Sequence, residues 1–319
     1  MNEFELIKNY FLKLTNNKNS LKLNDDVFFD KLKGLVVSVD TYVEGIHFYN
    51  FKKPDLVIKK ILRASISDLI CKGVDPKYYF LSGSGTKKTF TPKNLKKISD
   101  SLKKEQKKYN LFLGGGDTVY SNKLSFTVTS IGFSKKIIYR NCAKINDDIY
   151  VTGELGDSFI GLNILKNKLK LKKKFKKYFI DKYFLPNLQL KLAPDLFKFA
   201  NTSIDISDGL ISDLEKLINK SKMSYKLYLN KIPISDNLSI IINSKTKFDK
   251  LRIISHGDDY QILFTASPSK SRIINKSAKS LGVKISKIGK IYDKSIKSSI
   301  IDQNGNKISP IYKGYIHQF

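Results

Sequence analysis

Short aspartate motifs recur along this chain, and they are the residues with the clearest capacity for chemistry. The chain contains 23 Asp but only 6 Glu. The short arm of Asp suits a strand end or a tight turn where a metal ion must be held rigidly. The motifs fall at six places: Asp25-Asp26 in LNDDVFFD, Asp40 at the end of LVVSVD, Asp68 in ISDLICKG, Asp117 after Gly114-Gly115-Gly116, Asp205 and Asp208 in IDISDGL, and Asp258-Asp259 after Gly257.

Each motif alone has an ordinary structural explanation, because Asp-Gly pairs mark turns and Asp commonly caps helices. Asp208, for example, precedes Gly209-Leu210 and would cap the helix that follows. Six such places in one chain favour a shared role. Carboxylates that converge repel one another and raise each other's pKa, and multivalent cations remove that cost. Acids beside glycines that allow close backbone approach therefore predict a nucleoside triphosphate bound through Mg²⁺.

The sequence motifs of the common phosphoryl-transfer folds are missing. The chain has no GxxxxGK[ST] loop, no GxGxxG followed by VAIK, and no HRD or DFG. The small-residue run SGSG at 82–85 is interpreted as a turn, and Cys71 and Cys142 as inert small hydrophobic residues. Any phosphoryl transfer would therefore use a different fold.

The charge of the chain suggests a second class of function. Lys and Arg number 58 against 29 Asp and Glu, a formal net charge of +29, which is typical of proteins that bind nucleic acid or anionic membranes. However, only four of the basic residues are arginine, the residue best suited to reading bases and gripping phosphates, and the lysines are dispersed. We expect no specific nucleic-acid partner and keep a basic polyanion-binding protein as the alternative to an enzyme.

The chain has no sign of a membrane or secreted location. No run approaches about 18 consecutive apolar residues, the length that a membrane-spanning helix needs. The N-terminus MNEFELIKNYFLKL lacks the features of a secretory signal. Two cysteines make neither a disulfide framework nor a metal cluster. A reduced, cytoplasmic protein is therefore expected.

The acids need strands and helices to position them, and the sequence indicates where these lie. Lysine is absent from residues 35–50, 146–165 and 201–215, which suggests buried strands with acids at their ends. The lysine run 166–182 is expected to be an exposed helix or connector. Apolar periodicity predicts helices over 2–14, 54–73, 91–110, 155–165, 186–200, 208–221 and 268–282, and strands over 35–40, 78–85, 110–118, 123–134, 140–153, 202–207, 225–230, 260–266 and 283–292.

Both halves of the chain combine strands with helices. This pattern predicts an α+β protein of two domains, residues 1–140 and 141–319, without a close internal repeat.

Taken together and in order, the motifs resemble those of the thiamine-monophosphate kinases, within the aminoimidazole-ribonucleotide-synthetase-like ATP-binding superfamily. The resemblance extends nearly end to end, and the combination of VDTYVEGIHF with IDISDGL is specific where a lone GGD is not. The matching motifs are NDDVFF, LVVSVDTYVEGIHF, ISDLICKGVDPKY, LFLGGGDT, GDSFIGL, SIDISDGLISDLE, GDDYQILFT and the terminal YKGY.

The resemblance implies a fold and an activity. Each half would be a mixed β-sheet with helices packed on it, and residues 1–140 would form the ATP- and Mg²⁺-binding domain. The reaction would be the last step of thiamine diphosphate synthesis, in which ATP phosphorylates thiamine phosphate directly and in line. The protein would be a homodimer joined through N-terminal strands, with ATP near the subunit boundary.

The resemblance also implies roles for individual residues. No residue is expected to act as a general base, because the acceptor phosphate is already anionic. Gly116, Asp117, Arg140 and Ser207 would meet ATP, and His47, Asp258 and Tyr315 would meet thiamine phosphate. Several Mg²⁺ ions would be bound by Asp26, Ser38, Val39, Asp40, Asp68, Asp117, Asp205 and Asp208.

The chain departs from the family pattern at several positions. Asn24 and His256 stand where the family has Gly, and Asp258 stands where it has Glu. Val39 replaces a hydroxyl residue, so only its backbone carbonyl is left for a metal. Val119-Tyr120-Ser121 differs from the usual Thr-Arg-Gly. These departures concern the details of substrate contact rather than the class of reaction.

Another enzyme of the same superfamily is the remaining alternative. A selenide-dependent synthetase would carry a reactive N-terminal Cys, but no Cys precedes Cys71. A hydrogenase-maturation homologue would end in a Cys-bearing tail, whereas this chain ends in IHQF. The aminoimidazole-ribonucleotide synthetases share the acids but not VEGIHF followed by IDISDGL and GDDY.

Overall fold

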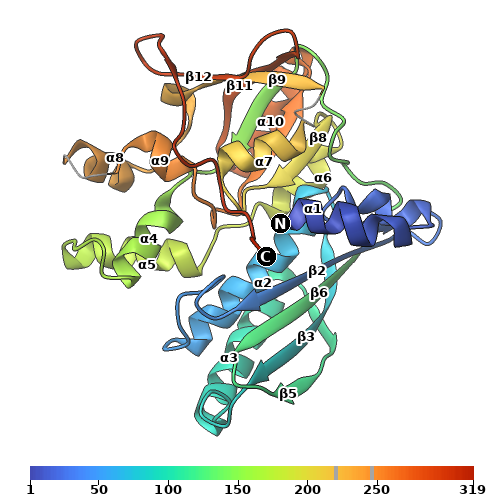
Figure 1. Ribbon diagram of the computed structural model, residues 1–319, viewed down its shortest axis with the longest axis vertical. Helices are drawn as coiled ribbons and strands as arrows, with labels where there is room; N and C mark the ends of the chain where they lie inside the picture. Colours follow the sequence, from blue (N-terminus) through green and yellow to red (C-terminus); the bar gives the residue numbers. More distant parts are fainter. Residues whose placement is uncertain (219–221, 245–247) are drawn as a thin grey trace.

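Two β-sheets, one in each half of the chain, organise the computed structural model of this protein (Figure 1). The structure describes residues 1–218, 222–244 and 248–319. The first half contains α1 (Glu3–Leu6), β1 (Phe28–Asp30), β2 (Leu35–Val43), α2 (Pro54–Cys71), β3 (Pro76–Gly85), α3 (Pro92–Tyr109), β4 (Phe112–Gly115), β5 (Thr118–Tyr120) and β6 (Ser125–Phe133).

The second half repeats the mixture of strands and helices. Its elements are β7 (Asp148–Thr152), α4 (Asp157–Leu165), α5 (Lys173–Phe184), α6 (Ala193–Leu196), β8 (Thr202–Asp205), α7 (Leu210–Leu217), β9 (Met223–Tyr228), α8 (Asp236–Asn243), α9 (Lys250–Ile254), β10 (Ile262–Ala266), α10 (Ser271–Leu281), β11 (Ile285–Asp293), β12 (Ser299–Ile301) and β13 (Lys307–Ile308).

Both sheets mix parallel and antiparallel pairs, as the α+β prediction with two mixed sheets required. The first runs in the order β1-β2-β6-β3-β4, with β5 also paired to β3. The second runs in the order β13-β12-β9-β11-β7-β10-β8. The predicted domain boundary at residues 140 and 141 falls in the connection between β6 and β7, and it stays a prediction because one hydrophobic core cluster includes residues of both halves.

Helix α2 is the element that joins the two halves. It contacts β2 and β6 of the first sheet and β8 of the second. Of its 18 residues, 14 are buried, because an apolar stripe faces each neighbour. Pro54 starts the helix at a position where its missing N–H costs nothing. Residues near the end of α2 can therefore reach both sheets.

The two chain ends meet in the middle of the molecule (Figure 1). Asn2 and Gln318 form a β-bridge, and the backbone N–H of Glu3 donates to the His317 carbonyl at 3.2 Å. This pairing holds the C-terminal segment beside the site described below.

Several predicted elements differ in length from those observed. The helix predicted over 2–14 is α-helical only in α1, and the chain continues to Leu14 in π- and 3₁₀-helical turns. The helix predicted over 186–200 shrinks to a 3₁₀ turn and the short α6, because Pro194 lacks an N–H and fits only a first turn. Residues 219–221, at the end of the predicted helix 208–221, lie outside the described residues.

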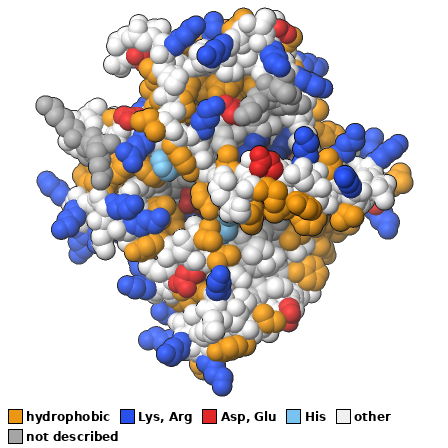
Figure 2. All heavy atoms as spheres, viewed as in Figure 1, with side chains coloured by type: hydrophobic (Ala, Val, Ile, Leu, Met, Phe, Trp, Pro, Cys, Tyr) orange, Lys and Arg blue, Asp and Glu red, His pale blue; other side chains and the backbone are white. Residues whose placement is uncertain are grey.

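The lysine run at 166–182 belongs partly to α5. Phe179 and Ile180 are buried in that helix, whereas its lysines other than Lys182 are exposed. Across the visible face of the molecule, Lys and Arg are scattered rather than gathered into one patch (Figure 2). Among the described residues no helix has the length and apolar character to cross a bilayer.

Candidate functional site

Strand β2 presents two of the predicted ligands on one side. Successive side chains of a strand point to opposite faces, so Ser38 and Asp40 share the face that α2 covers. Ser38 is only 2% exposed. Val39, between them, faces the other way and is 61% exposed. Its side chain therefore points away from the acids, and only its carbonyl remains as a predicted ligand.

The end of α2 ties the acids of both sheets together. The Ser38 hydroxyl donates to the Asp68 carboxylate at 2.5 Å, which links α2 to β2. The neighbouring Ser67 hydroxyl donates to Asp205, at the end of β8, at 2.6 Å. Ser67 and Asp68 thus connect Ser38 of β2 with Asp205 of β8, two residues more than 160 positions apart in the sequence.

Asp40, Asp68 and Asp205 are largely shielded from solvent, and each lies close enough to the others to shift their pKa values. Burial raises the pKa of Asp40 to about 6 and that of Asp205 to about 7. Burial, and then the charges of Asp40 and Asp205, raises the pKa of Asp68 well above its usual value. Such a group is stabilised when a cation neutralises it.

Within the described ranges, no three His, Cys, Asp or Glu side chains could hold a metal ion by themselves. The arrangement of Asp40, Asp68 and Asp205 nevertheless fits Mg²⁺, which takes one or two carboxylates per ion and completes its shell with phosphate oxygens and water.

Asp25 and Asp26 form a second acidic group, which is already neutralised. The buried Lys72 ammonium lies 2.7 Å from Asp25 and 2.8 Å from Asp26. The Arg140 guanidinium also pairs with Asp26, and the Arg140 backbone N–H donates to Asp25 at 2.9 Å. Two carboxylates therefore face two cations.

Asp208 belongs to a third group at the start of α7. Its carboxylate pairs with Lys216, which also lies 2.8 Å from Asp213. Asp213 accepts the backbone N–H groups of Asp208 and Gly209, each at 3.0 Å, and so fixes the turn that follows β8. Burial lowers the pKa of Arg140, while the charges of Asp25, Asp213, Asp205 and Asp208 raise it. Arg140 therefore lies between the second and third groups.

Gly116 and Asp117 stand apart from the other predicted ligands. Both are exposed, and the Asp117 carboxylate accepts only the Thr118 N–H, at 2.8 Å, among the described residues. Asp40 of β2 pairs with Val128 of β6, and Val128 pairs on its other side with Leu81 of β3. Gly116 lies one step further, against the carbonyl of Leu81. Three strand spacings, roughly 14 Å, therefore separate Gly116 from Asp40.

The residues predicted to meet thiamine phosphate gather around the C-terminal segment. The rings of His47 and Tyr315 lie 5.2 Å and 4.9 Å from that of His317. Asp258 is held by Lys60 of α2, at 2.5 Å, and by the Tyr260 hydroxyl, at 3.0 Å.

The predicted ATP-binding loop touches the predicted substrate loop. The Ser207 carbonyl accepts the backbone N–H of Asp258 at 2.9 Å. A Cβ on Gly257 would lie 1.7 Å from the Ser207 oxygen, so this approach requires glycine. Beside it, His256 stacks on Phe159 with ring centroids 3.8 Å apart, which gives that departure from the family pattern a packing role.

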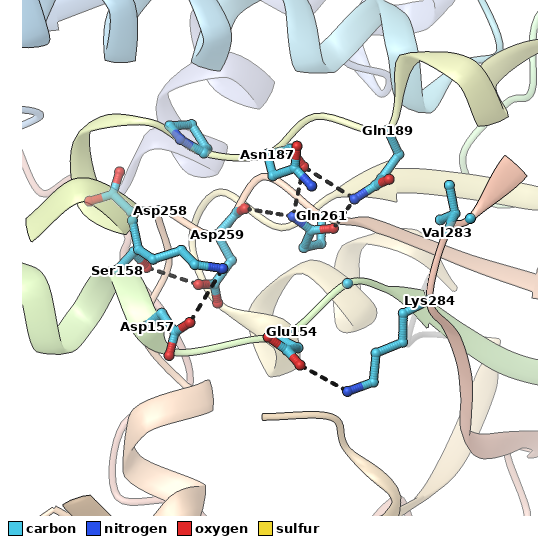
Figure 3. A pocket seen from close by; sticks show the side chains of 14 residues that line it. Glu154, Asp157, Ser158, Asn187, Gln189, Asp258, Asp259, Gln261, Val283 and Lys284 are labelled. Carbon is cyan, nitrogen blue, oxygen red and sulfur yellow. Dashed lines mark hydrogen bonds and ion pairs between the residues drawn. The ribbon is translucent and has the colours of Figure 1, made fainter. Parts of the chain in front are cut away.

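A polar cavity of about 230 Å³ borders Asp258 (Figure 3). It is lined by Asp157, Lys182, Asn187, Asp259 and Lys284 among others, and by none of Asp40, Asp68 and Asp205. In its wall Asp259 accepts the Ser158 hydroxyl at 2.9 Å and the Gly156 N–H at 3.0 Å. Burial raises the pKa of Asp259 to about 8.

Sequence reasoning missed three residues at this site: Lys60, Lys72 and His317. Both lysines are essentially inaccessible, with exposures of 1% and 0%. In a chain this rich in lysine, nothing local distinguishes a buried ammonium from a solvated one. His317 lies in the tail IHQF, whose position depends on the pairing of the chain ends.

Comparison with known proteins relates the whole chain to one family. Residues 24–134 match the family described as AIR synthase related protein, N-terminal domain. The thiamine-monophosphate kinase of Buchnera aphidicola (subsp. Acyrthosiphon pisum, strain APS) is 38% identical, over 86% of this chain and 87% of its own. That of Escherichia coli K12 is 32% identical over 99% and 98%. Among solved structures, AaThiL complexed with AMPPCP and TMP superposes with a TM-score of 0.84 at 25% identity, covering 99% of this chain and 97% of its own.

Proposed function

The chain belongs to the thiamine-monophosphate kinase family, and from that membership we propose that it transfers the terminal phosphoryl group of ATP to thiamine phosphate, which yields thiamine diphosphate and ADP. The observation that carries this proposal is the set of buried carboxylates Asp40, Asp68 and Asp205, assembled from both halves by α2. ATP and thiamine phosphate, both polyanions, must meet in this reaction. Carboxylates grouped in this way can hold the cations that neutralise the two phosphate chains.

We propose that Asp40, Asp68 and Asp205, with Ser38, hold Mg²⁺ ions. Bound there, Mg²⁺ would neutralise the phosphate oxygens and align them for in-line transfer. Asp117, Asp208 and the Val39 carbonyl are proposed as further ligands. Asp26 fits an ion less well, because both of its oxygens already face cationic side chains.

Arg140 is the residue we propose for the nucleotide phosphates, together with Ser207 and Gly116. Its guanidinium offers several donors to phosphate oxygens in a fixed plane. The Arg140 side chain is 15% exposed, so a ligand can reach it where it now pairs with Asp26. Binding ATP would exchange a carboxylate for a phosphate without leaving the cation unpaired.

His47 is proposed to contact thiamine phosphate as a neutral donor. Burial, and then the charge of the nearby His317, lowers its pKa to about 4. Its Nδ1 accepts the Val43 backbone N–H at 3.0 Å, so the proton lies on Nε2. His47 can therefore donate one hydrogen bond and takes no proton from the substrate. Asp258 and Tyr315 complete the proposed substrate contacts.

We further propose a homodimer built on the first sheet. Helix α2 packs on one face of that sheet and α3 packs on α2, whereas the other face of the sheet exposes apolar side chains. The exposed fractions are 61% for Val39, 39% for Phe80, 49% for Phe112 and 51% for Val119, which the strand register places on one face. An exposed apolar surface of this kind marks a protein contact. Asp117 lies beside it, so in a dimer this carboxylate would reach the nucleotide near the subunit boundary.

A cytoplasmic location is also proposed. Cys71 and Cys142 are both free thiols, which is usual in a reducing compartment. ATP is supplied in the same compartment.

A direct assay tests the proposed function. Purified protein with ATP, Mg²⁺ and thiamine phosphate should form thiamine diphosphate, and no product should form when either Mg²⁺ or thiamine phosphate is omitted. ATP binding by calorimetry without product would retain the nucleotide site and refute the acceptor. Asp117→Asn should abolish turnover while the circular dichroism spectrum stays unchanged.

A further inference from the structure

Lys72, directly after α2, places a positive charge inside the acidic site. Its side chain has no exposure to solvent. The ammonium lies 2.7 Å from Asp25, 2.8 Å from Asp26 and 2.9 Å from the Ser203 carbonyl of β8. An ammonium has three N–H donors, and these three oxygens satisfy all of them. Lys72 is therefore a fixed part of the site.

The cations around Asp25 and Asp26 differ in how firmly they are held. Arg140 is partly exposed and lies in the field of Asp205, Asp208 and Asp213, so it can turn towards a bound phosphate. Lys72 has no such freedom, because removing a buried ammonium from its carboxylates would leave unpaired charges with no water to solvate them. When Arg140 moves to a ligand, Lys72 stays between the two carboxylates and still neutralises one of their two charges.

A divalent ion on Asp26 would have to share its carboxylate with this ammonium. At contact distances two positive centres repel strongly where little water is present to screen them. The carboxylates of Asp40, Asp68 and Asp205 differ, since their hydrogen-bond partners are hydroxyl groups rather than cations. Lys72 acts on Asp68 only through its charge, without a direct contact. A divalent ion therefore binds more favourably to the group of Asp40, Asp68 and Asp205 than to Asp25 and Asp26, which are already paired with cationic side chains.

We propose that the Lys72 ammonium takes the place of one divalent ion at the Asp25–Asp26 end of the active site. Asp26 is then a partner of lysine and not a metal ligand, and the enzyme binds one ion fewer than its aspartates suggest. This inference rests on the proposed function, in which Asp68 and its neighbours hold Mg²⁺.

Counting bound Mn²⁺ tests the inference without measuring turnover. Free Mn²⁺ is followed by electron paramagnetic resonance during titration of the full-length protein with a non-hydrolysable ATP analogue. Asp26→Asn should bind the same number of ions as the wild type, with affinity unchanged within about twofold. Asp68→Asn should lose at least one ion or bind more than about tenfold more weakly. Loss of an ion in Asp26→Asn, as in Asp68→Asn, would overturn the inference.

Removing the ammonium gives the complementary measurement. Lys72→Met should bind one ion more than the wild type, and Lys72→Arg should bind the same number. Lys60→Met is the matched control, because Lys60 is an equally buried, carboxylate-paired lysine of α2 outside this acidic group. An extra ion in the control, or none in a folded Lys72→Met, contradicts the inference.

The experiment also separates two kinds of failure. If circular dichroism shows Lys72→Met to be unfolded, the comparison of Asp26→Asn with Asp68→Asn decides alone. A wild type that binds no Asp68-dependent Mn²⁺ refutes the proposed metal site and the inference with it. Binding that depends on both Asp68 and Asp26 refutes the inference alone.

Discussion

Asp258 has a backbone conformation that explains its identity. Its φ is +69°, in the left-handed region, which Asp and Asn tolerate better than longer side chains do. The family pattern has Glu here, and the shorter acid relieves that strain. Because the Asp side chain is shorter than that of Glu, its carboxylate lies close to the backbone. The ammonium of Lys60, on α2, lies 2.5 Å from it.

We expect Asp258→Ala to raise the KM for thiamine phosphate by about tenfold, because a hydrogen bond to a charged group contributes roughly 1.5–3 kcal/mol. The KM for ATP should change much less, since the phosphate-binding residues are left in place. Steady-state kinetics with each substrate varied in turn measures the difference. Asp100→Ala, at an exposed i,i+4 pair on α3, is the control and should behave as wild type. An equal or ATP-selective effect would contradict the substrate role of Asp258.

At the level of single residues, the sequence predicted acids better than their partners. Asp68 and Asp205 stand out because each sits in a short motif with few lysines. Ser67, which binds Asp205, and Lys72, which binds Asp25 and Asp26, carry no such mark. Their roles depend on contacts between distant segments, and those follow only from the packing of α2.

The elements around β3 show how closely backbones must approach at this site. A Cβ on Gly116 would lie only 1.9 Å from the carbonyl oxygen of Leu81, so no other residue fits there without a shift of the backbone. The Asp117 carbonyl also accepts the Gly83 N–H at 2.8 Å. The three-glycine run therefore lets the chain pass from β4 to β5 along one edge of β3, and this path sets the position of Asp117.

Gly116→Ala should push this segment away from β3 and displace Asp117. We expect kcat to fall at least tenfold, because misplacing a metal-binding group by about 1 Å costs up to a hundredfold. The melting temperature should fall by only a few degrees, since the segment is exposed. Gly305→Ala, in an exposed turn of the second half, controls for the loss of a glycine. Unchanged kcat would show that Asp117 has no role in turnover.

The secondary structure was predictable wherever a segment was long and periodic. The strand at 123–134 and the helix at 91–110 agree with β6 and α3 to within a few residues. By contrast, β1, β5 and β12 have three residues each, and β13 has two, too few to show an alternating pattern. These short strands exist because a neighbouring strand pairs with them.

For the molecule as a whole, the exposed face of the first sheet predicts its assembly. Val119→Lys places a charge in the proposed interface and should shift a dimer to monomers, which light scattering after size exclusion can measure. Activity should fall with dissociation, because Asp117 would lose the second subunit. Ile240→Lys is the control, since Ile240 is an exposed apolar residue of α8, 53% accessible, in the other half. A wild type that is already monomeric would refute the proposed dimer.

The buried acids also give the molecule a pH dependence with a definite sign. Folding raises the pKa of Asp259 to about 8 and that of Asp68 well above its usual value, mainly through burial. A group whose pKa is raised binds more protons when folded, so the free energy of unfolding falls as pH rises towards the folded pKa. His47 and His256, whose pKa values burial lowers, have the opposite effect only below about pH 6.5.

Between pH 6.5 and 8, the metal-free protein should therefore lose stability, by about 2 kcal/mol for each acid that stays protonated. Urea unfolding at several pH values measures this loss. Asp259→Asn should remove one such contribution, because an amide does not ionise. Mg²⁺ with an ATP analogue should remove the contribution of Asp205, whose pKa burial raises to about 7, since a bound cation stabilises the ionised carboxylate. It should leave the contribution of Asp259, which lies in the separate cavity of Figure 3. Stability that is flat or rising over this range would show that these carboxylates are ionised in the folded protein even without a cation.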